Sequence, residues 1–254
     1  MMLSSVTLTR LEKAAVDNGF DQELAGDHAW LGFASTQCSL RVWLTLLGGG
    51  AYCAALSKKN VANALGEYGT PLDPPLPHGA IACVAVADIP ALHRLVRRAF
   101  QLAKALPDEL LHEFENQTAG LPRSTEVERL VIQRVGQDLF RSGLLEYWEG
   151  HCAITGLDIP ALLCASHIKP WAECSTDAER LDIFNGLLLA THLDSLFDKG
   201  FITVTDVGEI DISPCLSGKH RKLLGVDSTF GVVRLAEGHK LYLQYHRTAV
   251  FLRG

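Results

Sequence analysis

The sequence predicts an α+β protein with two domains, an N-terminal mixed α/β domain and a C-terminal domain built around a ββα unit. Three observations lead to this prediction. Strand-like apolar runs and amphipathic stretches alternate over about the first 105 residues. A linker-like segment follows at 116–123, and two strand-like runs joined by a long loop then precede a short helical stretch at 191–198. At 254 residues the chain can fold one large or two smaller cores without disulfides or a structural metal.

The first domain is expected over residues 1–120 and is outlined by glycine and proline. Gly48, Gly49 and Gly50 interrupt a long apolar run and predict a turn or a close approach of two backbone segments. They fit neither GxxxxGK[ST] nor GxGxxG, so the turn is not expected to hold a nucleotide phosphate. The expected elements, in chain order, are an amphipathic helix, the apolar run with its turn, a proline-rich loop, a strand and a helix: 8–16, 38–56, 68–79, 80–87 and 90–106.

The charge balance disfavours a protein that coats nucleic acid by bulk attraction, although local basic clusters remain compatible with DNA binding. The formal net charge is -6. Residues 1–120 carry 9 basic and 12 acidic side chains, and residues 121–254 carry 14 and 17. Neither half is therefore a basic arm.

The cysteines and the apolar segments limit the class of protein further. The seven cysteines include no CxxC pair, so a cysteine-rich zinc site is not expected. Cys152, Cys164 and Cys174 lie near His151, but their spacing matches no common zinc site, and reduced, mostly buried thiols are expected instead. The N-terminus lacks a basic start followed by an apolar run, and no stretch approaches the roughly 18 apolar residues of a membrane span. We therefore expect a cytoplasmic protein without membrane contact.

The second domain is expected over residues 121–254 and begins with a long helix. Ser124, with Glu128 downstream, has the pattern of a helix start. Apolar residues then recur on one face of this helix and leave Arg134 and Arg141 largely on the other. These two arginines are equally well explained as phosphate contacts or as a solvated helix face.

Residues 162–198 have the pattern of a ββα unit. The stretch LLCASHIKPW predicts a strand that ends near His167, because Pro170 stops it; NGLLLA predicts a second strand, and THLDSLFD a short helix. Asp194 and Asp198 are four residues apart and therefore share a face of that helix. Such a unit has room for one metal ion between the end of the first strand and the first turns of the helix.

Four motifs follow one another in the second domain. They are CAITG at Cys152–Gly156, SHIKPW at Ser166–Trp171, NGLLL at Asn185–Leu189 and LFDKG at Leu196–Gly200. In this order they resemble the HNH endonucleases, a family with the ββα-metal fold, and in particular its bacterial restriction-endonuclease-like branch. The resemblance covers about 124–247 and does not reach the first domain.

The resemblance implies a role for each matching side chain. His167 takes the place of the general base that removes a proton from the attacking water, and an imidazole with a pKa near neutrality suits that task. Asn185 matches the residue that holds the loop between the strands and aims the histidine, and that in some members binds the metal. Ser166 occupies a position that other members fill with a metal-binding Asp or His, which is a departure because Ser is a poor ligand. A metal site facing His167 is therefore expected to depend on Asp194, Asp198 or His192, with waters and phosphate oxygens completing it.

The third motif position is open between His192 and Asp194. Asp194 falls where the family most often has His, whereas His192 lies two residues earlier, about 200° around the helix. Asp194 has a rival role, because THLD is also the spacing of a capping box in which Thr191 caps the helix and Asp194 returns a bond to it. Carboxylate and water ligands favour Mg²⁺ or Mn²⁺ as the cofactor.

The resemblance implies metal-dependent hydrolysis of phosphodiester bonds in double-stranded DNA, by a restriction or phage-defence nuclease whose first domain supplies recognition or regulation. Two alternatives stay open: a catalytically impaired DNA-binding or regulatory protein, which Ser166 favours, and a nuclease gated by a ligand or partner of the first domain. Cleavage at a short palindrome would favour a homodimer. The side chains expected to contact nucleic acid are Arg134, Arg141, Lys169, Lys199, His246 and Arg247.

Overall fold

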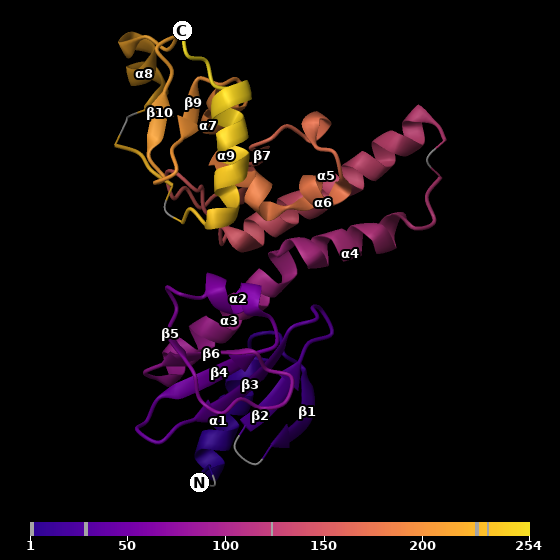
Figure 1. The fold of residues 1–254 in the computed structure, drawn as a ribbon, viewed down its shortest axis with the longest axis vertical. Coiled ribbons are helices and arrows are strands. Elements are labelled where there is room, and N and C mark those ends of the chain that lie inside the picture. Colours follow the sequence, from indigo (N-terminus) through magenta and orange to yellow (C-terminus); the bar gives the residue numbers. More distant parts are fainter. Residues whose placement is uncertain (1–2, 28–29, 123, 227–228, 233) are drawn as a thin grey trace. The chain divides into compact units, whose positions relative to one another are not determined.

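The computed structural model describes the chain apart from residues 1–2, 28–29, 123, 227–228 and 233. Two compact units are present, residues 1–109 and residues 110–254, and each contains both helices and strands (Figure 1). The α+β fold class expected from the sequence is confirmed. Within the described ranges, no helix is both long enough and apolar enough to cross a membrane.

The N-terminal unit is built on a six-stranded sheet in which every neighbouring pair is antiparallel. The spatial order is β1-β2-β3-β4-β6-β5, so β1 and β5 are the edge strands. The elements of this unit are α1 (Ser5–Val16), β1 (Gln22–Asp27), β2 (Trp30–Ala34), β3 (Arg41–Leu46), β4 (Tyr52–Leu56), α2 (Lys59–Ala64), β5 (Thr70–Leu72), β6 (Ala82–Val86) and α3 (Ile89–Ala105).

The two faces of this sheet bury different side chains. Successive residues of a strand point to opposite faces, so Val42 and Leu44 of β3 share one face and Trp43 lies on the other. Helices α1 and α3 contact each other and the central strands β3 and β4. On the Trp43 face, a separate cluster joins Trp43 to buried side chains of β2, β4 and β6, namely Trp30, Cys53, Ala55 and Cys83. Leu76 of the proline-rich segment and Ala80, which follows it, pack against this cluster.

The proline-rich segment contains a short strand that the sequence analysis does not predict. β5 pairs only with β6, and Pro71 lies opposite Val84. Proline is tolerated in an edge strand, because no neighbour on the outer side requires its missing N–H group. The expectation of a continuous loop over 68–79 is therefore wrong at Thr70–Leu72.

The C-terminal unit contains two short hairpins surrounded by helices. β7 pairs antiparallel with β8 and α7 follows β8 directly, so the expected ββα unit is present, and β9 pairs with β10. The elements are α4 (Pro107–Thr118, which begins in the N-terminal unit), α5 (Glu126–Tyr147), η1 (Pro160–Leu162), β7 (Leu163–His167), η2 (Trp171–Glu173), α6 (Asp177–Leu181), η3 (Ile183–Asn185), β8 (Gly186–Ala190), α7 (Thr191–Asp198), β9 (Ile202–Val204), β10 (Ile210–Ile212), α8 (Gly218–Leu224) and α9 (Glu237–Ala249).

The boundary between the units falls inside α4, after Glu109, whereas the sequence analysis places a domain boundary after residue 120. Leu110 and Phe114 of α4 are buried. Leu110 lies against Gly143 of α5, where even a Cβ atom would collide with it. The apolar side chains of α4 therefore assign most of this helix to the C-terminal core.

The expected linker at 116–123 is occupied by the end of α4 and a short turn, with Arg123 outside the described residues. The following helix, α5, is capped by Thr125 rather than Ser124. Glu128 N donates to Thr125 Oγ1 at 3.2 Å, and Thr125 N donates to Glu128 Oε2 at 2.8 Å. The reciprocal bonds of a capping box require a three-residue spacing, which Thr125 has and Ser124 does not.

Helices α5 and α7 both contact the β7–β8 hairpin, and they use its opposite faces. At Gly186 of β8 an added Cβ would meet the Phe140 ring of α5. His167 is paired with Gly186 and therefore projects to the same face, toward α5. On the other face, Cys164 Sγ lies 3.9 Å from Thr191 Oγ1 at the start of α7. The hairpin thus presents His167 to one helix and Cys164 to the other.

Gly200, two residues after the end of α7, is expected to be intolerant of any side chain. Its φ is 71°, and an added Cβ would overlap the carbonyl oxygen of Val250. Gly200→Ala is expected to lower the free energy of unfolding by more than about 2 kcal/mol, because the left-handed conformation alone costs roughly 1–2 kcal/mol for a residue with a Cβ. Gly150 has the same φ but open space around it, so Gly150→Ala should cost only the conformational part, about 1–2 kcal/mol. Urea denaturation compares the two variants, and equal losses would contradict the steric argument.

Candidate active site

His167 is the last residue of β7, and its imidazole packs between aromatic rings. The Phe140 ring stacks on it with centroids 3.8 Å apart, and the Trp171 ring meets it edge-on with centroids 5.5 Å apart. The side chain remains partly exposed. The two aromatic contacts limit the orientation of the ring and still leave part of it open to solvent.

One hydrogen bond determines which imidazole nitrogen carries the proton. Nε2 of His167 lies 2.9 Å from the carbonyl oxygen of Arg180. A carbonyl oxygen only accepts, so Nε2 donates, and Nδ1 of the neutral ring keeps its lone pair. Burial lowers the pKa of His167 below its usual 6.5, and the bond to Arg180 opposes this to a smaller extent. The ring is therefore neutral at neutral pH, with Nδ1 available as a base.

Asn185 is fully buried and ties together the two ends of the loop between β7 and β8. Its Oδ1 accepts from Lys169 N at 2.8 Å, and its Nδ2 donates to the carbonyl oxygens of Lys169 and Glu179, both at 3.2 Å. Glu179 directly precedes Arg180, whose carbonyl oxygen holds the imidazole. This geometry fits a residue that positions the loop, and the engaged, buried amide does not fit a metal ligand.

Helix α7 carries the two candidate carboxylates, and its N-terminus lacks the capping box that the THLD spacing suggests. Its N-cap is Ala190, and Thr191 Oγ1 donates to the carbonyl oxygen of Leu162 at 3.0 Å. The capping-box interpretation of THLD is therefore wrong, because Thr191 already belongs to the first helical turn and its hydroxyl binds the residue before β7. Asp194 consequently has no capping partner in Thr191.

Asp194 and Asp198 lie on one helix but in different surroundings. Burial, followed by the negative charge of Asp194, raises the pKa of the Cys164 thiol, which places the Asp194 carboxylate beside β7. Ser166, two residues along the same face of β7, is 4% exposed. Asp198 is exposed, and its charge acts on His246 of α9.

This donor set suits a hard divalent cation better than zinc. Among the residues that the structure describes, no three His, Cys, Asp or Glu side chains are grouped to hold a metal ion. The expected site uses only two carboxylates, Asp194 and Asp198 of α7, and His167 projects toward α5 on the other face of the hairpin. Magnesium sites use one or two carboxylates with waters and substrate phosphates, which Asp194 and Asp198 match. A catalytic zinc site takes three protein ligands.

Two histidines that the sequence places near the site have different surroundings. His192 is exposed on α7, whereas Asp194, the other residue considered for the third motif position, lies beside Cys164 of β7. His246 is 1% exposed, with Nδ1 2.9 Å from Thr203 Oγ1 and Nε2 3.0 Å from the carbonyl oxygen of Phe197. Both ring nitrogens are engaged, so the expectation that His246 contacts nucleic acid is wrong.

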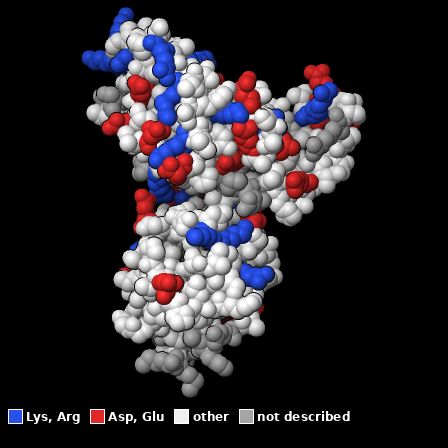
Figure 2. Space-filling model, viewed as in Figure 1, with Lys and Arg blue, Asp and Glu red and all other residues white. Residues whose placement is uncertain are grey.

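The basic side chains expected to contact DNA differ in availability. Arg134 and Lys199 are exposed. The other three are held within the protein: Arg141 by the carbonyl oxygens of Leu163 and Pro160, Lys169 by Glu179, and Arg247 by Val204 and Asp206. On the face of the C-terminal unit seen in Figure 2, Lys and Arg are interspersed with Asp and Glu rather than gathered in one basic patch. Phosphate contacts by the three engaged residues would have to replace these bonds.

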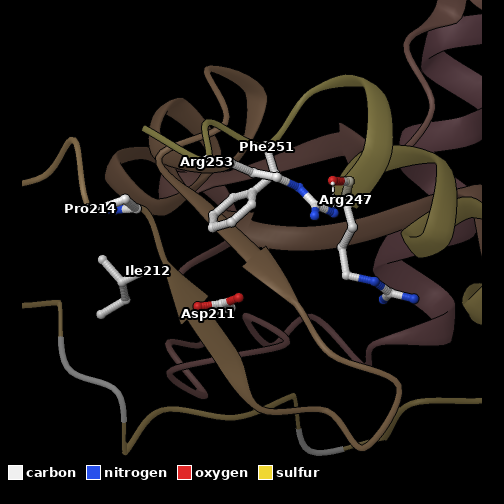
Figure 3. Close-up of a pocket in the computed structure, with 6 residues that line it drawn as sticks. All are labelled: Asp211, Ile212, Pro214, Arg247, Phe251 and Arg253. Carbon is white, nitrogen blue, oxygen red and sulfur yellow. Dashed lines mark hydrogen bonds between the residues drawn. The ribbon is translucent and has the colours of Figure 1, made fainter.

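A surface pocket near the C-terminus contains none of the residues expected for catalysis. Its lining combines two guanidinium groups, a carboxylate and apolar side chains: Asp211, Ile212, Pro214, Arg247, Phe251 and Arg253. Figure 3 shows Arg253 directed toward the backbone of Arg247, to whose carbonyl oxygen it donates at 3.0 Å. We therefore do not assign this pocket to the active site.

Arg180 contacts the His167 imidazole through its carbonyl oxygen, and no motif of the sequence assigns Arg180 a role. It lies in helix α6, within a stretch that reads as a polar loop. The sequence does contain a signal for this helix, since a threonine is a common N-cap residue. In the structure Thr176 Oγ1 accepts a hydrogen bond from Glu179 N at 3.1 Å. The bond from His167 to a backbone carbonyl has no such signal, since any residue supplies a carbonyl.

Comparison with known protein families agrees with this geometry. Residues 152–205, about a fifth of the 254-residue chain, match the family model described as HNH endonuclease. The matched segment contains β7, β8 and α7 with His167, Asn185 and Asp194, so this part of the C-terminal unit is similar to the HNH endonucleases. The resemblance to the HNH endonucleases is thus confirmed for this segment. No curated protein sequence matches the chain significantly.

Proposed function

We propose that this protein, which carries an HNH endonuclease domain at residues 152–205, is a metal-dependent endonuclease that hydrolyses phosphodiester bonds of double-stranded DNA. The observation that carries the proposal is the hydrogen bond from His167 Nε2 to Arg180 O, which leaves Nδ1 as a base within the matched segment. A neutral, partly exposed and immobilised imidazole is the group that activation of a water requires.

In the proposed reaction, Nδ1 of His167 takes a proton from a water molecule as the water oxygen attacks phosphorus. The bond from phosphorus to the 3′ oxygen breaks, and the leaving oxygen receives a proton from solvent. The imidazolium that forms is stabilised by the Arg180 carbonyl oxygen, since a hydrogen bond from a charged donor is stronger than one from a neutral donor. A divalent cation held by Asp194 and Asp198 would neutralise the charge that develops on the phosphate oxygens.

The biological role that we propose is restriction or phage defence, with the N-terminal unit as the recognition or regulatory part. The support for a separate role is that residues 1–109 form a compact unit with a core of their own. Supercoiled plasmid incubated with Mg²⁺ or Mn²⁺ is expected to give discrete fragments. A smear of products would contradict site-specific restriction, and no cleavage of modified or unmodified DNA would favour a catalytically impaired DNA-binding protein.

Asp194→Asn is expected to weaken Mn²⁺ binding by about 10-fold or more, since removal of even an outer partner of a metal site commonly has an effect of that size. The amide keeps the shape of the side chain and removes the negative charge that attracts the cation. Titration calorimetry with Mn²⁺ measures the affinity independently of DNA cleavage.

Asp158→Asn is the matched control, because Asp158 is an exposed aspartate of the same domain that belongs to none of the motifs. It should bind Mn²⁺ as the unmodified protein does. Equal affinity of the Asp194→Asn and Asp158→Asn proteins would remove Asp194 from the metal site.

A further inference from the structure

Arg180 uses its guanidinium to hold the loop that follows β7. Nη2 donates to the carbonyl oxygen of Cys174 at 2.6 Å, Nε to that of Trp171 at 3.4 Å, and Nη1 pairs with Asp177 Oδ1 at 2.9 Å. The guanidinium also lies over the Trp171 ring, 5.8 Å from its centroid. About a quarter of the Arg180 side chain is exposed, so most of the group is enclosed by these contacts.

The same residue contacts the base through its backbone. The Arg180 carbonyl oxygen accepts the hydrogen bond from His167 Nε2, and the Trp171 ring beneath the guanidinium meets the imidazole edge-on. Any movement of Arg180 would therefore change both contacts of His167 on this side. Phe140 supplies the packing on the other side of the ring.

Neighbouring bonds restrict Arg180 further. Lys169 Nζ pairs with Glu179 Oε1 at 2.6 Å, and Asn185 Nδ2 donates to the Glu179 carbonyl oxygen at 3.2 Å. Glu179 Oε2 also accepts from Ser175 N at 2.7 Å. The residue before Arg180 is thus attached to both ends of the loop and to Ser175, and the guanidinium adds bonds to Trp171, Cys174 and Asp177.

We propose that Arg180 is a positioning residue for His167: its guanidinium closes the loop so that its own carbonyl oxygen selects the Nε2-protonated form of the imidazole and leaves Nδ1 free. This inference rests on the proposed role of His167 as the general base. A group that must lie within hydrogen-bonding distance of the attacking water loses much of its effect when displaced by about 1 Å. The guanidinium itself need not touch DNA.

The test reads the imidazole directly. Long-range ¹H–¹⁵N correlation spectra of the full-length protein report which nitrogen of His167 carries the proton. In the unmodified protein at pH 7.5 we expect Nε2 protonated and Nδ1 bare, whereas in Arg180→Ala we expect a mixture of both forms. Arg180→Lys keeps a cation near Asp177 but cannot reach both carbonyl oxygens, so it should show the same change if Arg180→Ala does not fold.

Arg221 supplies the matched control, because its guanidinium also donates to two backbone carbonyl oxygens, those of Leu216 and Ser213, away from the matched segment. Arg221→Ala should leave the His167 signals unchanged. Unchanged His167 signals in a folded Arg180→Lys or Arg180→Ala protein would overturn the inference.

Plasmid cleavage separates this inference from the proposed function. Arg180→Lys is expected to lower kcat by about 10- to 100-fold with little change in KM for DNA. A higher KM with unchanged kcat would instead indicate that Arg180 binds DNA, and would overturn the inference. If the spectra change as expected while the unmodified protein cuts no DNA, the positioning of His167 is supported and the nuclease function fails.

Discussion

Replacement of His167 by glutamine is expected to lower the rate of DNA cleavage by about 10²- to 10⁴-fold, the usual contribution of a general base. Nδ1 of His167 is the atom proposed to accept the proton from water, and glutamine has no side-chain base. The amide of glutamine retains an N–H group for the Arg180 carbonyl oxygen, so the loop is expected to keep its structure. Cleavage of plasmid DNA at saturating Mg²⁺ measures the loss, and thermal unfolding confirms the fold.

His167→Ala is a less clean variant, because Phe140 and Trp171 would lose the ring that they pack against and the stability would fall as well. The exposed His220 of α8 supplies the control, and His220→Ala should cut DNA at about the unmodified rate. The rate should rise with pH through the pKa of His167 and level off by neutral pH, because burial places that pKa below 6.5. A His167→Gln protein with full activity would show that another group removes the proton.

Acid is expected to destabilise the C-terminal unit between about pH 6.5 and pH 4. Burial lowers the pKa of both His239 and His246 to about 4, whereas the unfolded chain keeps the usual value of 6.5. In this window the unfolded state binds more protons, so the free energy of unfolding falls as pH falls and recovers as pH rises. At about 1.4 kcal/mol per pKa unit, each histidine contributes roughly 3 kcal/mol, a large share of a typical domain's stability of about 5–15 kcal/mol.

His239→Phe tests this pH dependence. His239 lies among the rings of Tyr147, Trp148 and Phe184, and its Nε2 is buried with no hydrogen-bond partner among the described atoms. A phenylalanine suits this apolar enclosure, so the variant should stay folded at pH 7 and lose the roughly 3 kcal/mol that His239 contributes to the acid-induced fall in stability.

The measurement is the free energy of unfolding in urea at several values between pH 4 and pH 7. His220→Ala should retain the unmodified slope, since His220 is exposed. A slope in His239→Phe that equals the unmodified slope would show that other groups cause the acid sensitivity. His246 would still titrate in that variant, with the charges of Asp198 and Arg247 close to it.

Short-range patterns were enough to predict much of the fold and part of the site. The ββα unit follows from two apolar runs, a proline that stops the first of them and a helix with two aspartates at a four-residue spacing. The ordered motifs from Cys152 to Gly200 lead to the HNH family, and His167 and Asn185 follow from them. These features depend on residues close together in the chain, whose conformational preferences and spacings can be read without the fold.

Contacts between distant segments decided the remainder. Thr191 suits a helix cap by residue type, but the hairpin brings the Leu162 carbonyl oxygen within its reach. His246 resembles a site residue, yet strand β9 and helix α7 supply partners to both of its ring nitrogens. Pro71 lies in a strand because β6 provides the pairing edge.

His167 shows most clearly which features the sequence determined and which the tertiary structure decided. The motif names His167, but the carbonyl oxygen that leaves its Nδ1 free belongs to Arg180, thirteen positions further along the chain. In the proposed arrangement, the Arg180 guanidinium and the Asn185 amide close the intervening loop and hold that oxygen at the imidazole. A protonation state selected by backbone geometry depends on where the loop lies in space, and residue types alone carry no record of that position.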